Sequence, residues 1–119
     1  MRFIDEIGFS LKPGQEQAFQ QWLVKNEDAL AKAYPKGSKY LGTFVVIYNA
    51  EKAGGDWRTL VEVDSYGTLD KVAAAGKDPK NELSRLTQEA VNFFDASPLA
   101  PQGRSLMKAV ADATVFKSK

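Results

Sequence analysis

Hydrophobic residues recur at two different spacings along this chain, and the order of these spacings restricts the fold more than any other feature. Between residues 3 and 11 they alternate, with Phe3, Ile7 and Phe9 on one face of an extended segment. After Pro13 and a glycine, Phe19 and Trp22 begin a helical spacing that continues to about residue 33. The sequence therefore predicts a strand followed by a long amphipathic helix, with Pro13 at its first position.

The rest of the chain continues in the same manner. Residues 38–48 are rich in aromatic and β-branched side chains, and residues 57–64 alternate again, so both segments are predicted as strands. A short helix is expected at 68–75, and Asp78 followed by Pro79 is expected to begin a stronger one. A last strand is predicted at 104–111.

This order predicts one α+β domain over residues 1–119 with the ferredoxin-like βαββαβ arrangement. Two right-handed crossovers would place the helices on one face of an antiparallel four-stranded sheet. The other face would remain more apolar than a solvated sheet face, and would carry Ile4, Leu41, Val45, Ile47 and Leu60. We therefore expect a second copy of the sheet to cover it in a homodimer.

Composition excludes several kinds of chemistry. The chain has neither histidine nor cysteine, so it offers no histidine base, no thiolate nucleophile and no histidine or thiolate metal ligand. We expect no metal and no cofactor. The net charge is +1 and no basic run is present, which argues against nucleic acid as a partner. No segment has the composition of a signal peptide or a membrane span, so a cytoplasmic location is expected.

The strand that leads through residues 9–14, Phe-Ser-Leu-Lys-Pro-Gly, into a helix with Phe19 and Trp22, and the aromatic strand at 40–48, give the chain a family resemblance. It resembles the dimeric α+β barrel superfamily, which includes antibiotic-biosynthesis-monooxygenase-like, haem-degrading and stress-responsive proteins. The resemblance implies a homodimer whose two sheets close into a barrel with helices outside. It does not select an activity, and the haem-degrading branch uses a histidine that this chain lacks.

A first candidate site combines Glu6, Arg58 and Glu62, which alternation places on the face assigned to the barrel interior. An arginine between two carboxylates could orient a substrate while a desolvated glutamate acts as a base. Ion pairs between neighbouring strands are common, so a structural network explains the same residues.

A second candidate site is aromatic. Tyr40, Tyr48, Trp57 and Tyr66 could line a pocket for a flat apolar ligand, with hydroxyl groups fixing its orientation. Phe44 belongs to the same aromatic group. Core packing is the alternative for such residues, above all for Phe44 and Trp57 beneath the helices.

Three classes of function remain open after these observations. The first is a small dimeric protein that binds an apolar or aromatic molecule in the barrel interior. The second is a cofactor-independent monooxygenase or isomerase, and the third is a structural or partner-binding module. The space between the two sheets would distinguish them.

Overall fold

The computed structural model describes residues 2–48, 55–97, 100 and 102–111. Strands and helices follow one another as β1(Phe3–Phe9), α1(Glu16–Ala33), β2(Ser38–Val45), β3(Trp57–Val63), α2(Tyr66–Lys77), α3(Glu82–Val91) and β4(Gly103–Lys108). The predicted α+β class and the order strand, helix, strand, strand, helix, strand are confirmed, and the additional short helix is α2.

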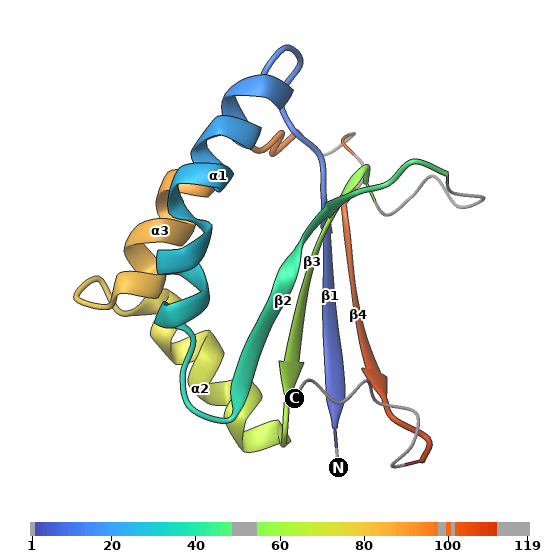
Figure 1. The fold of residues 1–119 in the computed structure, drawn as a ribbon, viewed down its shortest axis with the longest axis vertical. Helices are drawn as coiled ribbons and strands as arrows, with labels where there is room; N and C mark the ends of the chain where they lie inside the picture. Colours follow the sequence, from blue (N-terminus) through green and yellow to red (C-terminus); the bar gives the residue numbers. More distant parts are fainter. Residues whose placement is uncertain (1, 49–54, 98–99, 101, 112–119) are drawn as a thin grey trace.

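The four strands form one antiparallel sheet in the order β2-β3-β1-β4, which is the ferredoxin-like arrangement. The central strand β1 pairs with β3 through Phe3 opposite Val63, and with β4 through Ile4 opposite Met107. β2 and β4 lie at the two edges (Figure 1). The sheet of one chain is thus open and is not closed into a barrel.

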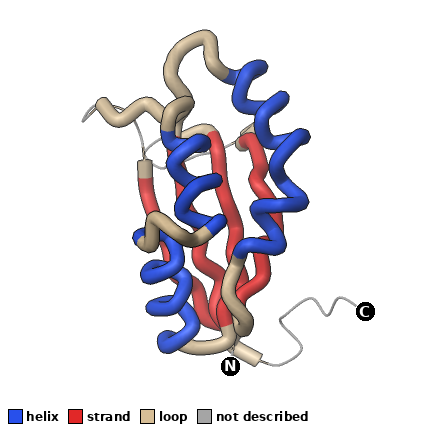
Figure 2. Tube along the Cα trace, turned by 90° about the vertical axis from the view of Figure 1, so that its left-hand side faces the viewer, coloured by secondary structure: helices blue, strands red, loops and turns tan. Residues whose placement is uncertain are grey.

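The three helices of the described residues, α1, α2 and α3, lie on the same side of the sheet (Figures 1 and 2). Side chains between the two layers form the core, which is divided into three clusters around Phe19, Leu86 and Val63. Phe19 is 2% exposed and contacts the edge of Trp57 from β3, with ring centres 5.3 Å apart. The alternation of β1 puts Phe3 and Phe9 into this layer, as the sequence predicts.

A bulge in β2 corrects the expected faces of that strand. The register shifts between Tyr40 and Gly42, so that one extra residue lies in β2, and Gly42 adopts a φ of +140° that glycine tolerates. After the shift, Phe44 lies opposite Arg58 and Val45 opposite Trp57. Phe44 therefore faces away from the helices, and Val45, which plain alternation assigns to that open face, faces the helices.

Two helix starts also differ from the sequence prediction. Pro13 lies in a turn in which the Gln15 amide donates to the Lys12 carbonyl at 3.1 Å, and α1 begins only at Glu16. Asp78 ends α2, since its amide donates to Ala74, and α3 begins after a further turn. Pro13 and Pro79 thus belong to connecting turns and not to the first turn of a helix.

None of the described helices is long and apolar enough to cross a membrane.

Candidate functional site

The predicted group Glu6, Arg58 and Glu62 lies on the open face of the sheet, opposite the helices. In the register of β1 and β3, Glu6 faces Leu60 and Gly8 faces Arg58, so the two charged residues are diagonal neighbours. Arg58 Nε lies 3.7 Å from Glu6 Oε1, and the arginine side chain is only 14% exposed. Alternation therefore predicted the face of these residues and one ion pair between them.

Glu62 forms an ion pair with Arg2 and not with Arg58. Its Oε1 lies 3.6 Å from Arg2 Nη1, while Arg58 Nη1 donates to the carbonyls of Gly55 and Trp57. Arg58 and Glu62 are four residues apart on one strand, which separates their Cα atoms by about 13 Å. The expected arginine between two carboxylates is thus replaced by two separate ion pairs.

The four predicted aromatic residues are not brought together. Tyr40 and Trp57 are buried on the helix-facing side, where Trp57 packs in the cluster of Phe9 and Phe19. Tyr66 is 66% exposed at the start of α2, with its ring centre 4.8 Å from that of Phe3, and Tyr48 is 88% exposed beyond the end of β2. None of the four lies on the open face within the sheet, and Trp57 has the packing role that was its alternative.

A chain of hydroxyl groups runs along the helix-facing side beneath α1. Tyr40 donates to Glu27 Oε2 at 2.9 Å, and its oxygen lies 2.6 Å from Thr43 Oγ1. Thr43 Oγ1 in turn lies 3.0 Å from Thr59 Oγ1 on β3. Burial is the main cause that raises the pKa of Tyr40, which keeps its hydroxyl protonated. Sequence alternation missed this chain because the bulge brings Thr43 onto the same face as Tyr40.

Asp5 and Arg104 form a second polar group on the same side. Asp5 is 3% exposed between the apolar side chains of β1, and Arg104 reaches it from the edge strand β4. The hydrogen bond to Asp5 raises the pKa of Arg104 above its ordinary value. Burial and the nearby Asp5 carboxylate together raise the pKa of Tyr34 to about 12. The local sequence of β1 shows a carboxylate on an apolar strand face, but it does not indicate that Arg104 is its partner.

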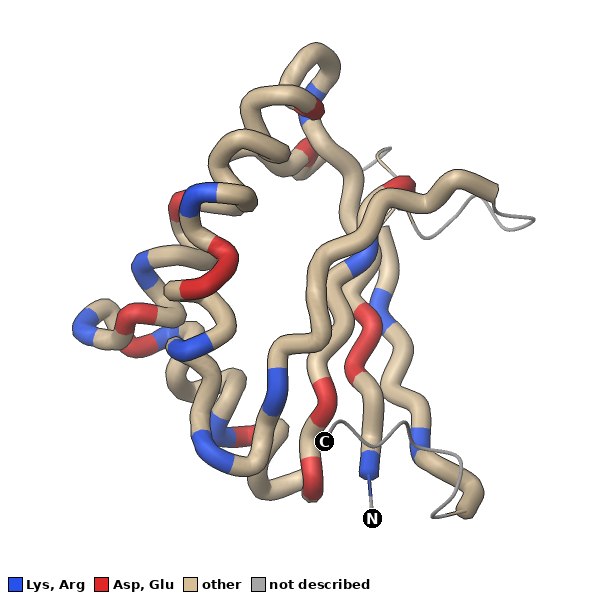
Figure 3. Tube along the Cα trace, viewed as in Figure 1, with Lys and Arg blue, Asp and Glu red and all other residues tan. Residues whose placement is uncertain are grey.

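Charged residues also occur along the helices (Figure 3). In the part of the chain that the structure describes, no group of three or more carboxylates converges as a metal site. The ion pairs and hydroxyl groups on the two faces of the sheet offer hydrogen bonds and paired charges, which can bind and orient a molecule.

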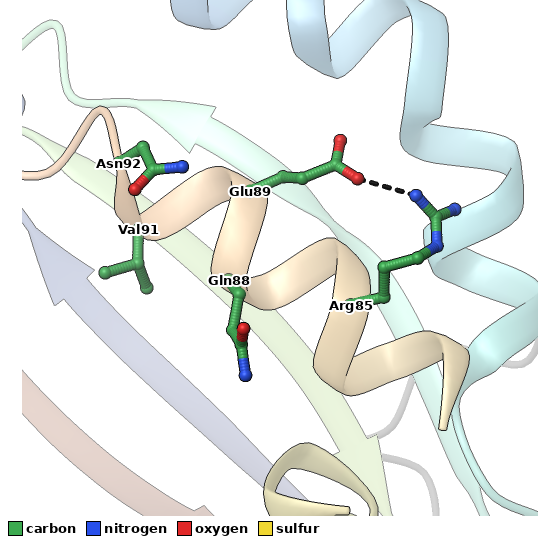
Figure 4. Close-up of a pocket in the computed structure, with 5 residues that line it drawn as sticks. All are labelled: Arg85, Gln88, Glu89, Val91 and Asn92. Carbon is green, nitrogen blue, oxygen red and sulfur yellow. Dashed lines mark hydrogen bonds and ion pairs between the residues drawn. The ribbon is translucent and has the colours of Figure 1, made fainter. Parts of the chain in front are cut away.

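A shallow depression of about 530 Å³ lies beside the end of α3 (Figure 4). Arg85 binds Glu82 and also Glu89, with 2.6 Å between Arg85 Nη1 and Glu89 Oε2. Glu89 also accepts a hydrogen bond of 3.0 Å from Trp22 Nε1. The hydrogen bond between Trp22 and Glu89 joins α1 to α3. Because the polar groups of the depression bind one another, they offer little to a ligand.

Comparisons with known proteins identify the fold but no family. No protein-family model matches the chain, and no curated protein matches it. A NIPSNAP family protein from Agrobacterium tumefaciens has a similar structure, with a TM-score of 0.66 and 8% identity over 94% of this chain and 96% of the other. An uncharacterised NIPSNAP-like domain protein from Burkholderia xenovorans gives a TM-score of 0.64 and 10% identity, over 93% of this chain and 87% of that one.

A third structure is described as a dimeric ferredoxin-like protein of unknown function, from Jannaschia. It gives a TM-score of 0.59 with 11% identity, over 92% of this chain and 100% of the other. Identities this low show a shared fold alone. The first two neighbours are described as NIPSNAP-like or NIPSNAP family proteins and the third as ferredoxin-like, so the comparisons support the fold of this chain and assign it no role.

Proposed function

We propose that this protein is a homodimer in which the open faces of two sheets meet, and that it binds a small apolar or aromatic molecule. The proposal rests mainly on the unequal covering of the sheet, because the helices α1, α2 and α3 of the described residues all pack on one face (Figures 1 and 2). A second copy of the same face is self-complementary and closes two open faces at once.

Apolar side chains on the open face favour its burial. Phe44 on β2 is 48% exposed and Met107 on β4 is 47% exposed, at opposite edges of the sheet. Ile4 and Leu60 lie between them on the two inner strands and are only partly buried. These apolar side chains lie along a diagonal between the paired charges of the face, and exposed apolar side chains that gather on one face are typical of an interaction site.

Charges on the same face do not prevent its burial. Glu6 is paired with Arg58, and Glu62 with Arg2, within one chain. Burying a paired charge costs less than burying an isolated one, because the partner replaces part of the lost hydration. The face can therefore enter a contact without leaving these carboxylates unpaired.

One of the structural neighbours supports a dimer, because the Jannaschia protein of similar fold is described as dimeric. A stable interface requires roughly 1,200 Å² or more of buried surface in total. We expect the contact between the two open faces to bury at least this area.

The ligand part of the proposal rests on the helix-facing side. Tyr40 and Trp57, two of the four aromatic residues considered for a pocket, lie there and not between the sheets. The hydroxyl chain that begins at Tyr40 supplies polar groups in an otherwise apolar layer, which is the composition of most small-molecule sites.

Two neighbouring residues of β2 provide a matched test of the dimer. Phe44 faces the open side and is 48% exposed, while Val45 faces the helices and is 45% exposed. Phe44→Asp should dissociate the dimer, because it places an unpaired charge in the contact. Val45→Asp introduces the same charge on the other face and should leave the dimer intact.

Sedimentation velocity of the two variants beside the parent measures this difference. Dissociation by Phe44→Asp alone supports the open-face dimer. A parent that sediments as a monomer, or two variants that dissociate equally, would contradict it.

A further inference from the structure

One row of residues crosses the helix-facing side of the sheet, one from each strand. In the register of the strands Thr43 lies opposite Thr59, Thr59 opposite Ile7, and Ile7 opposite Arg104. We call these four residues the helix-facing row. Thr59 and Ile7 belong to the inner strands and yet remain partly exposed.

The rows on either side of it are buried on the inner strands, while Val45 and Leu106 at their edges are 45% and 42% exposed. Trp57 and Phe9 on one side are each 6% exposed, and Tyr40 and Val61 on the other are 9% and 2% exposed. The helix-facing row is therefore an accessible band between two packed parts of the core, and it contains polar side chains at both ends.

The direction of the hydrogen bonds determines which group can bind at the end of the row that Thr43 and Thr59 form. Tyr40 has one hydroxyl hydrogen and donates it to the Glu27 carboxylate, so Thr43 must donate to Tyr40. Thr43 then has no hydroxyl hydrogen left, so Thr59 donates to Thr43. The oxygen of Thr59 then has a free lone pair and, within the described residues, no donor to fill it.

Arg104 defines the second end of the row. Its Nε and Nη2 bind the two oxygens of Asp5, at 2.9 and 2.7 Å. Its Nη1 has no partner among the described residues, and the side chain is 60% exposed. The second end therefore offers a hydrogen-bond donor whose charge is already balanced by Asp5.

We propose that the helix-facing row binds a small, neutral aromatic molecule with an O–H donor at one end and a carbonyl oxygen at the other. The donor binds Thr59 Oγ1, the carbonyl accepts from Arg104 Nη1, and the ring lies over Ile7. This inference rests on the ligand part of the proposed function and is independent of the dimer.

The charges around the row explain the preference for a neutral ligand. Asp5 neutralises Arg104, and Glu27 lies at the far end of the hydroxyl chain on the same side of the sheet. An anionic ligand would meet two carboxylates and one arginine, so its charge would not be compensated.

Two probes of nearly the same shape test the donor. 4-Hydroxyacetophenone carries both groups, whereas 4-methoxyacetophenone lacks the O–H. Probes with about ten non-hydrogen atoms are expected to bind weakly, with a Kd of about 0.1–1 mM, which NMR titration measures. The hydroxyl probe should shift the backbone amides of Ile7, Thr43 and Thr59 and bind about tenfold more tightly than the methoxy probe.

Thr59→Val removes the acceptor with little change in volume, and Thr87→Val on the exposed side of α3 is the control. Thr59→Val should make the two probes bind equally, whereas Thr87→Val should keep the tenfold difference. This comparison is made within one variant and is therefore insensitive to a change in its stability.

The possible failures are distinguishable. Shifts confined to Ile4 and Leu60, or equal affinity of the two probes for the parent, would overturn the site at the helix-facing row while the protein still binds small molecules. Absence of shifts with both probes would overturn this site together with the ligand part of the proposed function.

Discussion

Asp5 and Arg104 form a two-point ion pair that joins the central strand β1 to the edge strand β4, with the residues 99 positions apart in the sequence. Asp5 is almost fully buried, while the arginine is largely exposed. The remaining side chains of β4 are exposed on both faces. The pair is therefore a main side-chain attachment of β4 to the rest of the sheet.

Replacing Arg104 should leave the buried Asp5 carboxylate without its ion-pair partner and destabilise the fold. Arg104→Met is expected to lower the free energy of unfolding by about 2 kcal/mol, less than for a fully buried pair because water can reach Asp5 once the exposed arginine is removed. Urea unfolding measures the loss. In Arg104→Met combined with Asp5→Leu most of it should be recovered, and a double variant as unstable as the single one would show that the pair is not the cause.

Two glycines should respond in opposite directions to alanine. Gly37 has a φ of +93°, and a Cβ there would lie 2.7 Å from Thr68 Oγ1 and 2.9 Å from Asp64 Oδ1. Gly37→Ala should therefore destabilise the fold by about 1–3 kcal/mol. Gly76 lies within α2 with no atom within 4 Å of such a Cβ, so Gly76→Ala should stabilise it by about 0.5–1 kcal/mol. Thermal unfolding of both variants checks the signs, and a shift in the same direction for both would be inconsistent with this geometry.

Stability should depend on pH in the alkaline range through Tyr34. Its pKa is raised from 10.0 to about 12 in the folded state by burial and by Asp5. Because the pKa is higher in the folded state, Tyr34 contributes fully to stability below about pH 10. That contribution is lost as the pH rises toward 12, because Tyr34 of the unfolded chain releases its proton at a lower pH than Tyr34 of the folded protein. In urea unfolding between about pH 9 and pH 11, Tyr34→Phe should lose less stability than the parent.

Tyr66→Phe is the control for this measurement, since Tyr66 is 66% exposed at the start of α2. If the parent and Tyr34→Phe lose stability to the same extent as the pH rises, the buried position of Tyr34 beside Asp5 does not control the alkaline response.

Local patterns in the sequence were sufficient to predict most of the architecture. The change between alternating and helical spacing predicted each strand and helix, and the strict alternation of β1 and β3 predicted the shared face of Glu6 and Arg58. The same alternation failed in β2, where one extra residue exchanges the faces of Phe44 and Val45. Gly42 was the local signal, because an isolated glycine within a strand pattern is typical of a bulge, but the register of a bulge depends on pairing with the neighbouring strand.

The polar groups of the helix-facing side were missed for the same reason. Thr43 and Thr59 come together only after the bulge, and Asp5 and Arg104 only once the order and register of β1 and β4 are known. The isolated Asp5 between Phe3 and Ile7 was the one available signal, because a carboxylate on an apolar strand face requires a partner. The sequence does not indicate which residue that partner is.

The mass of the parent protein in solution tests the central claim most directly. Light scattering across a series of micromolar concentrations should give twice the 13.1 kDa of one chain, because a second copy covers the open face of the sheet. A mass of 13.1 kDa throughout that series would contradict the account.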